Sequence, residues 1–61
     1  MPSREERKKL KEAAADHVAN AMLELSRVVK MLGFNKRLRE TATDIEISLY
    51  GLYKRLQGVK L

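Results

Sequence analysis

The sequence predicts an all-α fold, an antiparallel hairpin of two long helices, and two observations support this prediction. Apolar residues recur at alternating steps of three and four along both halves of the chain, the spacing of a and d positions in a coiled coil. The repeat is interrupted once, at Gly33-Phe34-Asn35. Because so short a link makes neighbouring helices run antiparallel, we expect the chain to fold back at residues 33–35.

The first helix is expected over about residues 4–32. Ser3 and Glu6 match an S-x-x-E capping box, which marks a helix start. Gly33 is expected to end this helix in a left-handed conformation. The apolar stripe consists of Ala14, Val18, Ala21, Leu25, Val28 and Leu32, widened by Ala15, Met22 and Val29. A face of this width is typical of a helix in a bundle.

The second helix is expected over about residues 36–57, so that residues 1–61 form one helical-hairpin domain. Asn35 is a favourable N-cap, and Gly58 is expected to end the helix. The apolar stripe of this helix consists of Leu38, Ala42, Ile45, Leu49, Leu52, Leu56 and Val59. We expect this stripe to pack against the stripe of the first helix.

The size of the chain predicts self-association. A chain of 61 residues buries little surface, and the absence of cysteine excludes a disulfide or a thiolate metal site. We therefore expect a homo-oligomer, with a dimer that forms a four-helix bundle as the first choice and larger helical oligomers as the other. Gly51 lies mid-helix, where it costs about 1 kcal/mol relative to Ala, so close approach of another helix is expected there. The candidate oligomer or partner interface is Ala19, Leu23, Ile47, Tyr50, Gly51 and Tyr53.

A basic charge balance predicts an anionic partner. Lys and Arg number 13 against 8 acidic residues, a formal net charge of +5. Basic residues open the second helix against its own dipole and gather around the turn, where an anion would find a favourable site. Those at the turn are Arg27, Lys30, Lys36, Arg37 and Arg39. At the opposite end Lys54 and Arg55 are expected near the basic start of the first helix and near Lys60. A second interpretation is that these cations only keep the protein in solution.

The sequence predicts neither an enzyme nor a bound cofactor or metal. His17 is the single histidine, and the carboxylate pairs Glu12/Asp16 and Glu40/Asp44 lack the histidine motifs of a di-metal bundle. No phosphate-binding glycine loop or nucleophile motif is present. No apolar run is long enough to cross a membrane, and the first residues lack the apolar segment of a secretory signal. A cytoplasmic protein that does not bind membranes is therefore expected.

In length, hairpin shape and heptad seam, the layout resembles the Rop family of plasmid-encoded RNA-binding proteins. The resemblance implies a dimer that forms a four-helix bundle and binds RNA. It assigns no binding residues, because no motif of that family matches this chain residue by residue. Small phage and plasmid proteins of similar layout also inhibit host defence, sequester signalling nucleotides or act as regulators, and we expect this chain to be of that kind.

Two main functional hypotheses follow. In the first, a small homo-oligomeric helical protein captures a phosphate-bearing ligand, either RNA or a small signalling nucleotide, with the cations at its two ends. In the second, the chain is a protein-protein interaction module or inhibitor that docks a partner helix on its outer apolar residues. A structural oligomer without a ligand is a third hypothesis.

Overall fold

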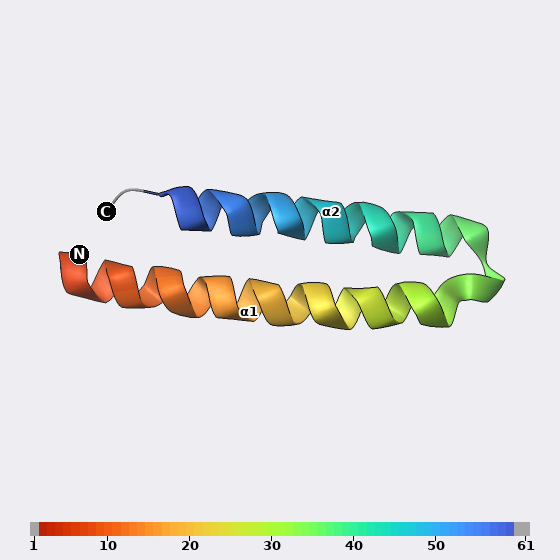
Figure 1. The fold of residues 1–61 in the computed structure, drawn as a ribbon, viewed down its shortest axis with the longest axis horizontal. Helices are drawn as coiled ribbons and strands as arrows, with labels where there is room; N and C mark the ends of the chain where they lie inside the picture. Colours follow the sequence, from red (N-terminus) through yellow and green to blue (C-terminus); the bar gives the residue numbers. More distant parts are fainter. Residues whose placement is uncertain (1, 60–61) are drawn as a thin grey trace.

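The computed structural model describes residues 2–59 and consists of two long helices side by side (Figure 1). Helix α1 spans Arg4–Met31, a short 3-10 helix η1 spans Leu32–Phe34, and α2 spans Lys36–Gly58. The helices run antiparallel, which confirms the predicted all-helical hairpin. The predicted contribution of Lys60 to the basic end lies outside the described residues. Neither helix is long and apolar enough to cross a membrane within residues 2–59.

Both predicted helix starts are confirmed by side-chain caps. The Ser3 hydroxyl accepts a hydrogen bond from the backbone N–H of Glu6 at 3.2 Å. The Asn35 side-chain oxygen accepts one from the N–H of Leu38 at 3.1 Å. Each cap satisfies an N–H group that the first turn of a helix leaves without an intrahelical partner. These bonds fix where the two helices begin.

The predicted left-handed glycine at the turn is wrong. No residue of the described chain, Gly33 included, has a positive φ angle. The chain instead continues right-handed from α1 into η1, and the N–H of Asn35 donates to the carbonyl of Leu32 at 3.0 Å. A tighter 3-10 turn satisfies carbonyl groups at the end of a helix without a left-handed residue. Gly33 is therefore not required here for its conformational freedom.

The contact face of α2 also differs from the predicted stripe. Ala42 is buried and Leu49 and Leu56 are half-buried, so these three a positions face α1 as expected. The d positions do not, because Leu38, Ile45, Leu52 and Val59 stay between 46% and 49% exposed. Half-buried residues at the e positions take their place in the seam. These are Arg39, Glu46 and Tyr53.

Helix α1 also contacts α2 mainly through its a and e positions. Its a positions Val18, Leu25 and Leu32 are half-buried, and so are the e positions Ala15, Met22 and Val29. Of its d positions, Val28 is 37% exposed, whereas the small residues Ala14 and Ala21 are half-buried. Each e residue is as large as the d residue before it, and Met22 is larger than Ala21, so the e side presents more apolar surface to α2. The seam is thus a/e on α2, and on α1 it is a/e with the d alanines at its edge.

The hairpin has almost no interior of its own. Among the described residues only Ala42, at 6% exposure, is buried. Large apolar side chains from Leu10 at one end to Phe34 at the turn remain exposed. The molecule is a rod of 48 × 16 × 14 Å, and two helices in contact along one line cannot enclose a core. Most of its apolar surface is therefore available to other molecules.

Candidate functional site

The predicted anion site at the turn is assembled only in part. Asn35 sets the start of α2, so that Lys36 and Arg37 project from its first turn. Lys36 Nζ lies 3.9 Å from Glu40 Oε1, and Arg27 donates to Glu24 Oε1 at 3.2 Å. Both pairs are exposed and each contributes only about 0.3–0.5 kcal/mol. Lys30 and Arg37 have no Asp or Glu oxygen within 4.0 Å among the described residues.

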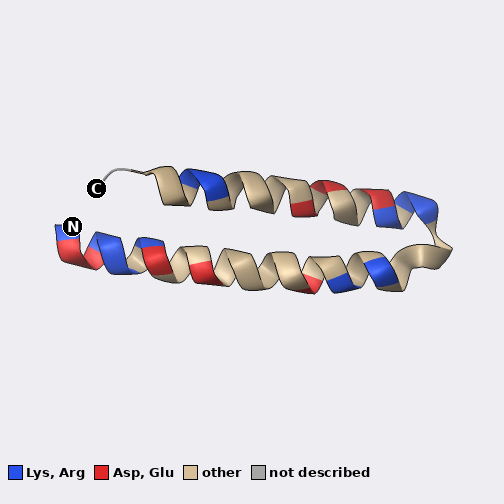
Figure 2. Ribbon diagram, in the orientation of Figure 1, with Lys and Arg blue, Asp and Glu red and all other residues tan. Residues whose placement is uncertain are grey.

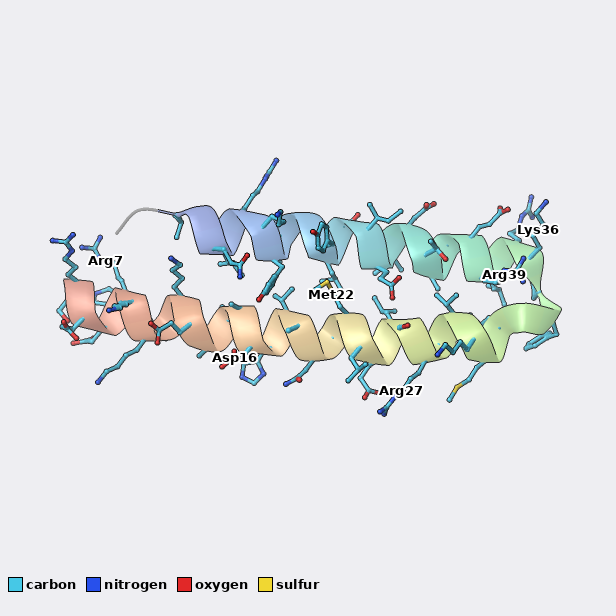
Figure 3. All side chains as sticks on the ribbon, viewed as in Figure 1. Arg7, Asp16, Met22, Arg27, Lys36 and Arg39 are labelled. Atoms are coloured by element: carbon cyan, nitrogen blue, oxygen red, sulfur yellow. The ribbon has the colours of Figure 1, made fainter. Side chains whose placement is uncertain are left out.

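Three of the five cations at the turn, Arg27, Lys36 and Arg39, point in different directions (Figure 3). Figure 3 shows Arg27 directed away from α2 and Lys36 directed outward from the start of α2. Arg39 instead lies between the two helices and is half-buried in the seam. The long aliphatic stem of an arginine suits such a position, because the stem covers apolar surface while the guanidinium reaches water. The turn therefore carries a diffuse positive charge and not a convergent set of ligands.

The open end of the hairpin has a second basic surface with a hollow. A cavity of about 500 Å³ is lined by residues from the start of α1 and by Val59. Lys11 Nζ donates to the backbone carbonyl of Val59 at 3.3 Å, which links α1 to the end of α2. The α1 residues that line this cavity are Arg4, Glu5, Lys8, Lys11 and Glu12. With three cations and two carboxylates, its lining is mixed in charge.

The predicted cations Lys54 and Arg55 do not line this cavity. Lys54 Nζ lies 5.8 Å from the centre of the Tyr50 ring, a cation–π contact at an exposed site. Arg55 lines a different hollow, together with Ser48, Gly51 and Leu52. Both still contribute to the positive potential of the open end, because they lie in its last helical turns.

The candidate interface residues divide between two sides of the hairpin. Ile47 and Tyr50 line a hollow of about 310 Å³ together with Met22 and Glu46. Met22 reaches this position from α1 by pointing toward α2 (Figure 3). We call Met22, Ile47 and Tyr50 the Ile47 patch. Ala19 and Leu23 are exposed but line no part of this hollow.

Two other predicted interface residues, Gly51 and Tyr53, do not line the hollow of the Ile47 patch. Gly51 lines a separate hollow of about 320 Å³ with Ser48, Leu52 and Arg55. Tyr53 is half-buried in the seam, and its hydroxyl accepts a hydrogen bond from Gln57 Nε2 at 3.0 Å. Gly51 and Ile47 therefore line different hollows, although both are predicted as parts of one interface.

One surface is not predicted from the sequence, and we call it the exposed stripe: Leu38, Ile45, Leu52 and Val59. These residues were assigned to the seam, yet each is about half exposed. They follow one another at steps of seven, so Leu38, Ile45 and Leu52 lie in one row along α2, and Val59 follows directly after the helix. Their regular spacing was visible in the sequence, but the periodicity could not tell which side of the apolar face meets α1.

Charge is distributed unevenly along the rod. Figure 2 shows Lys and Arg at both ends, whereas the middle carries only acidic and uncharged residues. No Lys or Arg occurs at residues 12–26 or 40–53. Of the twelve cations within residues 2–59, ten have no Asp or Glu oxygen of that range within 4.0 Å. The two ends are thus separate positive regions.

Comparison with protein-family models, with curated proteins and with solved structures gives no match for this chain. Residues 2–59 contain no cluster of three histidine, cysteine, aspartate or glutamate side chains that could hold a metal ion. His17 is exposed on α1. The geometry of the surfaces is therefore the basis for a functional proposal.

Proposed function

We propose that this chain is a homo-oligomeric, non-enzymatic binding protein that captures a phosphate-bearing ligand, RNA in particular, at its two basic ends. The observation that supports this proposal is the separation of the cations into two end regions with few ion pairs (Figure 2). Unpaired Lys and Arg side chains release counterions when they bind phosphates, which favours association with a polyanion. A cytoplasmic regulator or inhibitor of phage or plasmid type is the setting that we propose for it.

The spacing of the two ends favours RNA over a small nucleotide. Sixteen residues separate Lys11 from Arg27 along α1. At a rise of 1.5 Å per residue this is about 24 Å, roughly seven steps of 3.4 Å along one nucleic-acid strand. A nucleic acid can contact both ends at once, whereas a nucleotide can contact one end only. The exposed aromatic ring of Tyr50, beside Lys54, adds a stacking surface near the open end.

The test is fluorescence anisotropy with a labelled 20-nucleotide single-stranded RNA and a labelled RNA hairpin between 50 and 300 mM NaCl. Arg37→Gln is expected to weaken binding and to reduce the slope of log K against log [salt] by about 0.7 for the single strand, because one phosphate contact is lost. Asp16→Asn is the matched control. It changes one charge at an exposed site in the middle of the rod and should leave the salt slope unchanged (Figure 3).

Failure to bind either RNA at 50 mM NaCl would refute RNA capture. A panel of mononucleotides and cyclic dinucleotides, followed by thermal shift, then tests the small-ligand form of the proposal. A nucleotide that stabilises the fold while RNA does not would place the ligand at a single end of the hairpin.

A second candidate function is the docking of a partner helix on the Ile47 patch. The observation that favours it is the hollow that these residues form together with Glu46. Glu46 is half-buried and has no Lys or Arg nitrogen within 4.0 Å among the described residues. An amphipathic helix with apolar residues and one cation would complement this hollow. Ile47→Lys should then abolish binding to the partner while Arg37→Gln leaves it intact. The opposite pattern would favour phosphate capture.

A further inference from the structure

We infer that the exposed stripe is the surface on which a second copy of this chain packs. This inference rests on the self-association in the proposed function and names the surface that carries it. The stripe is the row of d positions Leu38, Ile45, Leu52 and Val59, which the a/e seam leaves outside the hairpin. This surface differs from the Ile47 patch, which lies on the side of the hairpin where the e positions are.

Both helices contribute to this side of the hairpin. Two antiparallel helices are related by a two-fold axis perpendicular to both, so equivalent heptad positions of α1 and α2 lie on the same side. On α1 the d residues of this side are Ala14 and Ala21, which are half-buried, and Val28, which is 37% exposed. The exposed g residues Leu10 and Met31 extend the apolar surface toward the two ends of α1. The face is therefore wide enough to receive two further helices and not a single peptide.

The charge of this face suits an identical partner. The d and g positions from Leu10 to Met31 and from Leu38 to Val59 include only two charged residues, Glu24 and Arg55, besides His17. A two-fold interface places the same patch on both sides, so a strongly charged patch would repel itself. Interface centres are depleted of charged residues, as this face is. The cations of the chain lie at the ends of the rod, beside this face and not in its middle (Figure 2).

The exposed area of the hairpin matches what a dimer would cover. The chain has a solvent-accessible surface of 5155 Å². A compact monomer of its mass, 7.0 kDa, would have roughly 4,000 Å². The difference, roughly 1,100 Å², is of the size that each partner contributes to a stable interface, about 800 Å². Association through one long face would bring the chain to the surface area of a compact fold.

Gly51 provides an independent indication that a helix approaches this side closely. It lies in the middle of α2, where glycine weakens a helix relative to alanine. A Cβ atom at Gly51 would have no neighbour within 4 Å outside the local helix backbone of the described chain, so nothing in the hairpin requires a glycine there. The hollow that it lines with Ser48 and Leu52 borders the exposed stripe. A helix of a second copy would fill this hollow.

The test compares two isoleucines of α2 that lie two residues apart on opposite sides of the hairpin. Ile45 belongs to the exposed stripe and Ile47 to the Ile47 patch, and both are largely exposed, at 49% and 63%. Light scattering of the full chain without RNA should give about twice the mass of 7.0 kDa for the wild type and for Ile47→Lys. Ile45→Lys should raise the dimer dissociation constant at least about a hundredfold, since two-fold symmetry places two lysines in the interface.

The wild-type thermal midpoint is measured over a hundredfold range of protein concentration as a second readout. A rise with concentration is expected for a dimer. Ile45→Lys could lose its helicity when it dissociates. In that case the rise of the wild-type midpoint still supports the inference, provided that Ile47→Lys stays dimeric and helical. The inference is overturned if Ile45→Lys keeps the wild-type mass, or if Ile47→Lys alone dissociates. A monomeric wild type with a constant midpoint overturns both the stripe and the proposed self-association. Loss of RNA binding changes none of these readouts, so the two proposals fail separately.

Discussion

The cap of α2 predicts that one chemical change, asparagine to alanine, has opposite effects at two positions. Asn35→Ala removes the side-chain oxygen that accepts the N–H of Leu38 at 3.1 Å. Loss of such a cap costs about 1 kcal/mol, within a range of about 0.5–2 kcal/mol. For a chain of 61 residues this corresponds to a fall of about 4–8 °C in the thermal midpoint. The absence of any acidic residue in the first turn of α2 leaves no other side chain to compensate.

Asn20 is the matched control because it lies exposed in the middle of α1. Asn20→Ala should stabilise the chain by up to about 0.7 kcal/mol, since alanine has the higher helix propensity and no cap is lost. Urea titrations followed by circular dichroism, all at one protein concentration, give the two free energies of unfolding. If Asn35→Ala leaves stability unchanged, or if both substitutions destabilise equally, the capping argument for the turn is refuted.

Three further predictions concern the seam and the two sides of the hairpin. Ala42→Leu should lower the free energy of unfolding by about 1–3 kcal/mol in a urea titration, because Ala42 is buried; the exposed control Ala19→Leu should change it by less than about 0.5 kcal/mol. Glu46→Leu should raise the thermal midpoint by about 4–8 °C, as half-burial of a leucine contributes about 1 kcal/mol; a lower midpoint would mean that the glutamate stem covers the seam better. Gly51→Ala should increase helicity at low protein concentration, where it contributes about 0.8–1 kcal/mol to α2. In the dimer the added methyl group should weaken association by about 1–3 kcal/mol. Unchanged association in light scattering would contradict this prediction.

The location of the helices and of the turn could be predicted from local sequence. Ser3 and Asn35 cap helices because their short side chains reach N–H groups three residues ahead, a contact that needs no tertiary structure. The position of the reversal was also predicted, but its conformation was not. Gly33 suits a left-handed cap, yet the chain takes a 3-10 turn without any positive φ angle. Either conformation satisfies the terminal carbonyl groups, so the sequence did not distinguish them.

The candidate sites were predicted as groups of residues and not as surfaces. The cations of the turn do lie at one end of the rod, but Arg39 is half-buried in the seam and Arg27 points away from α2 (Figure 3). Ile47 and Gly51 are one helical turn apart, yet Ile47 lines a hollow with Met22 of α1 and Gly51 lines another with Ser48, Leu52 and Arg55 of α2 alone. Proximity in sequence predicts at which end of the rod each group of residues lies. It does not predict the direction in which the individual side chains point.

By itself the sequence determined two amphipathic helices, their caps and their antiparallel order, because these depend on local periodicity and on a short link. Only the tertiary structure decided which side of each apolar face is used. Three positions of each heptad, a, d and e, are close enough to meet a neighbouring helix, and two helices in contact along one line can cover only part of such a face. The hairpin uses a and e, so that Met22 and Val29 of α1 and Glu46 and Tyr53 of α2 are all half-buried in the seam. The d positions of α2, Ile45 and Leu52 among them, are left about half exposed.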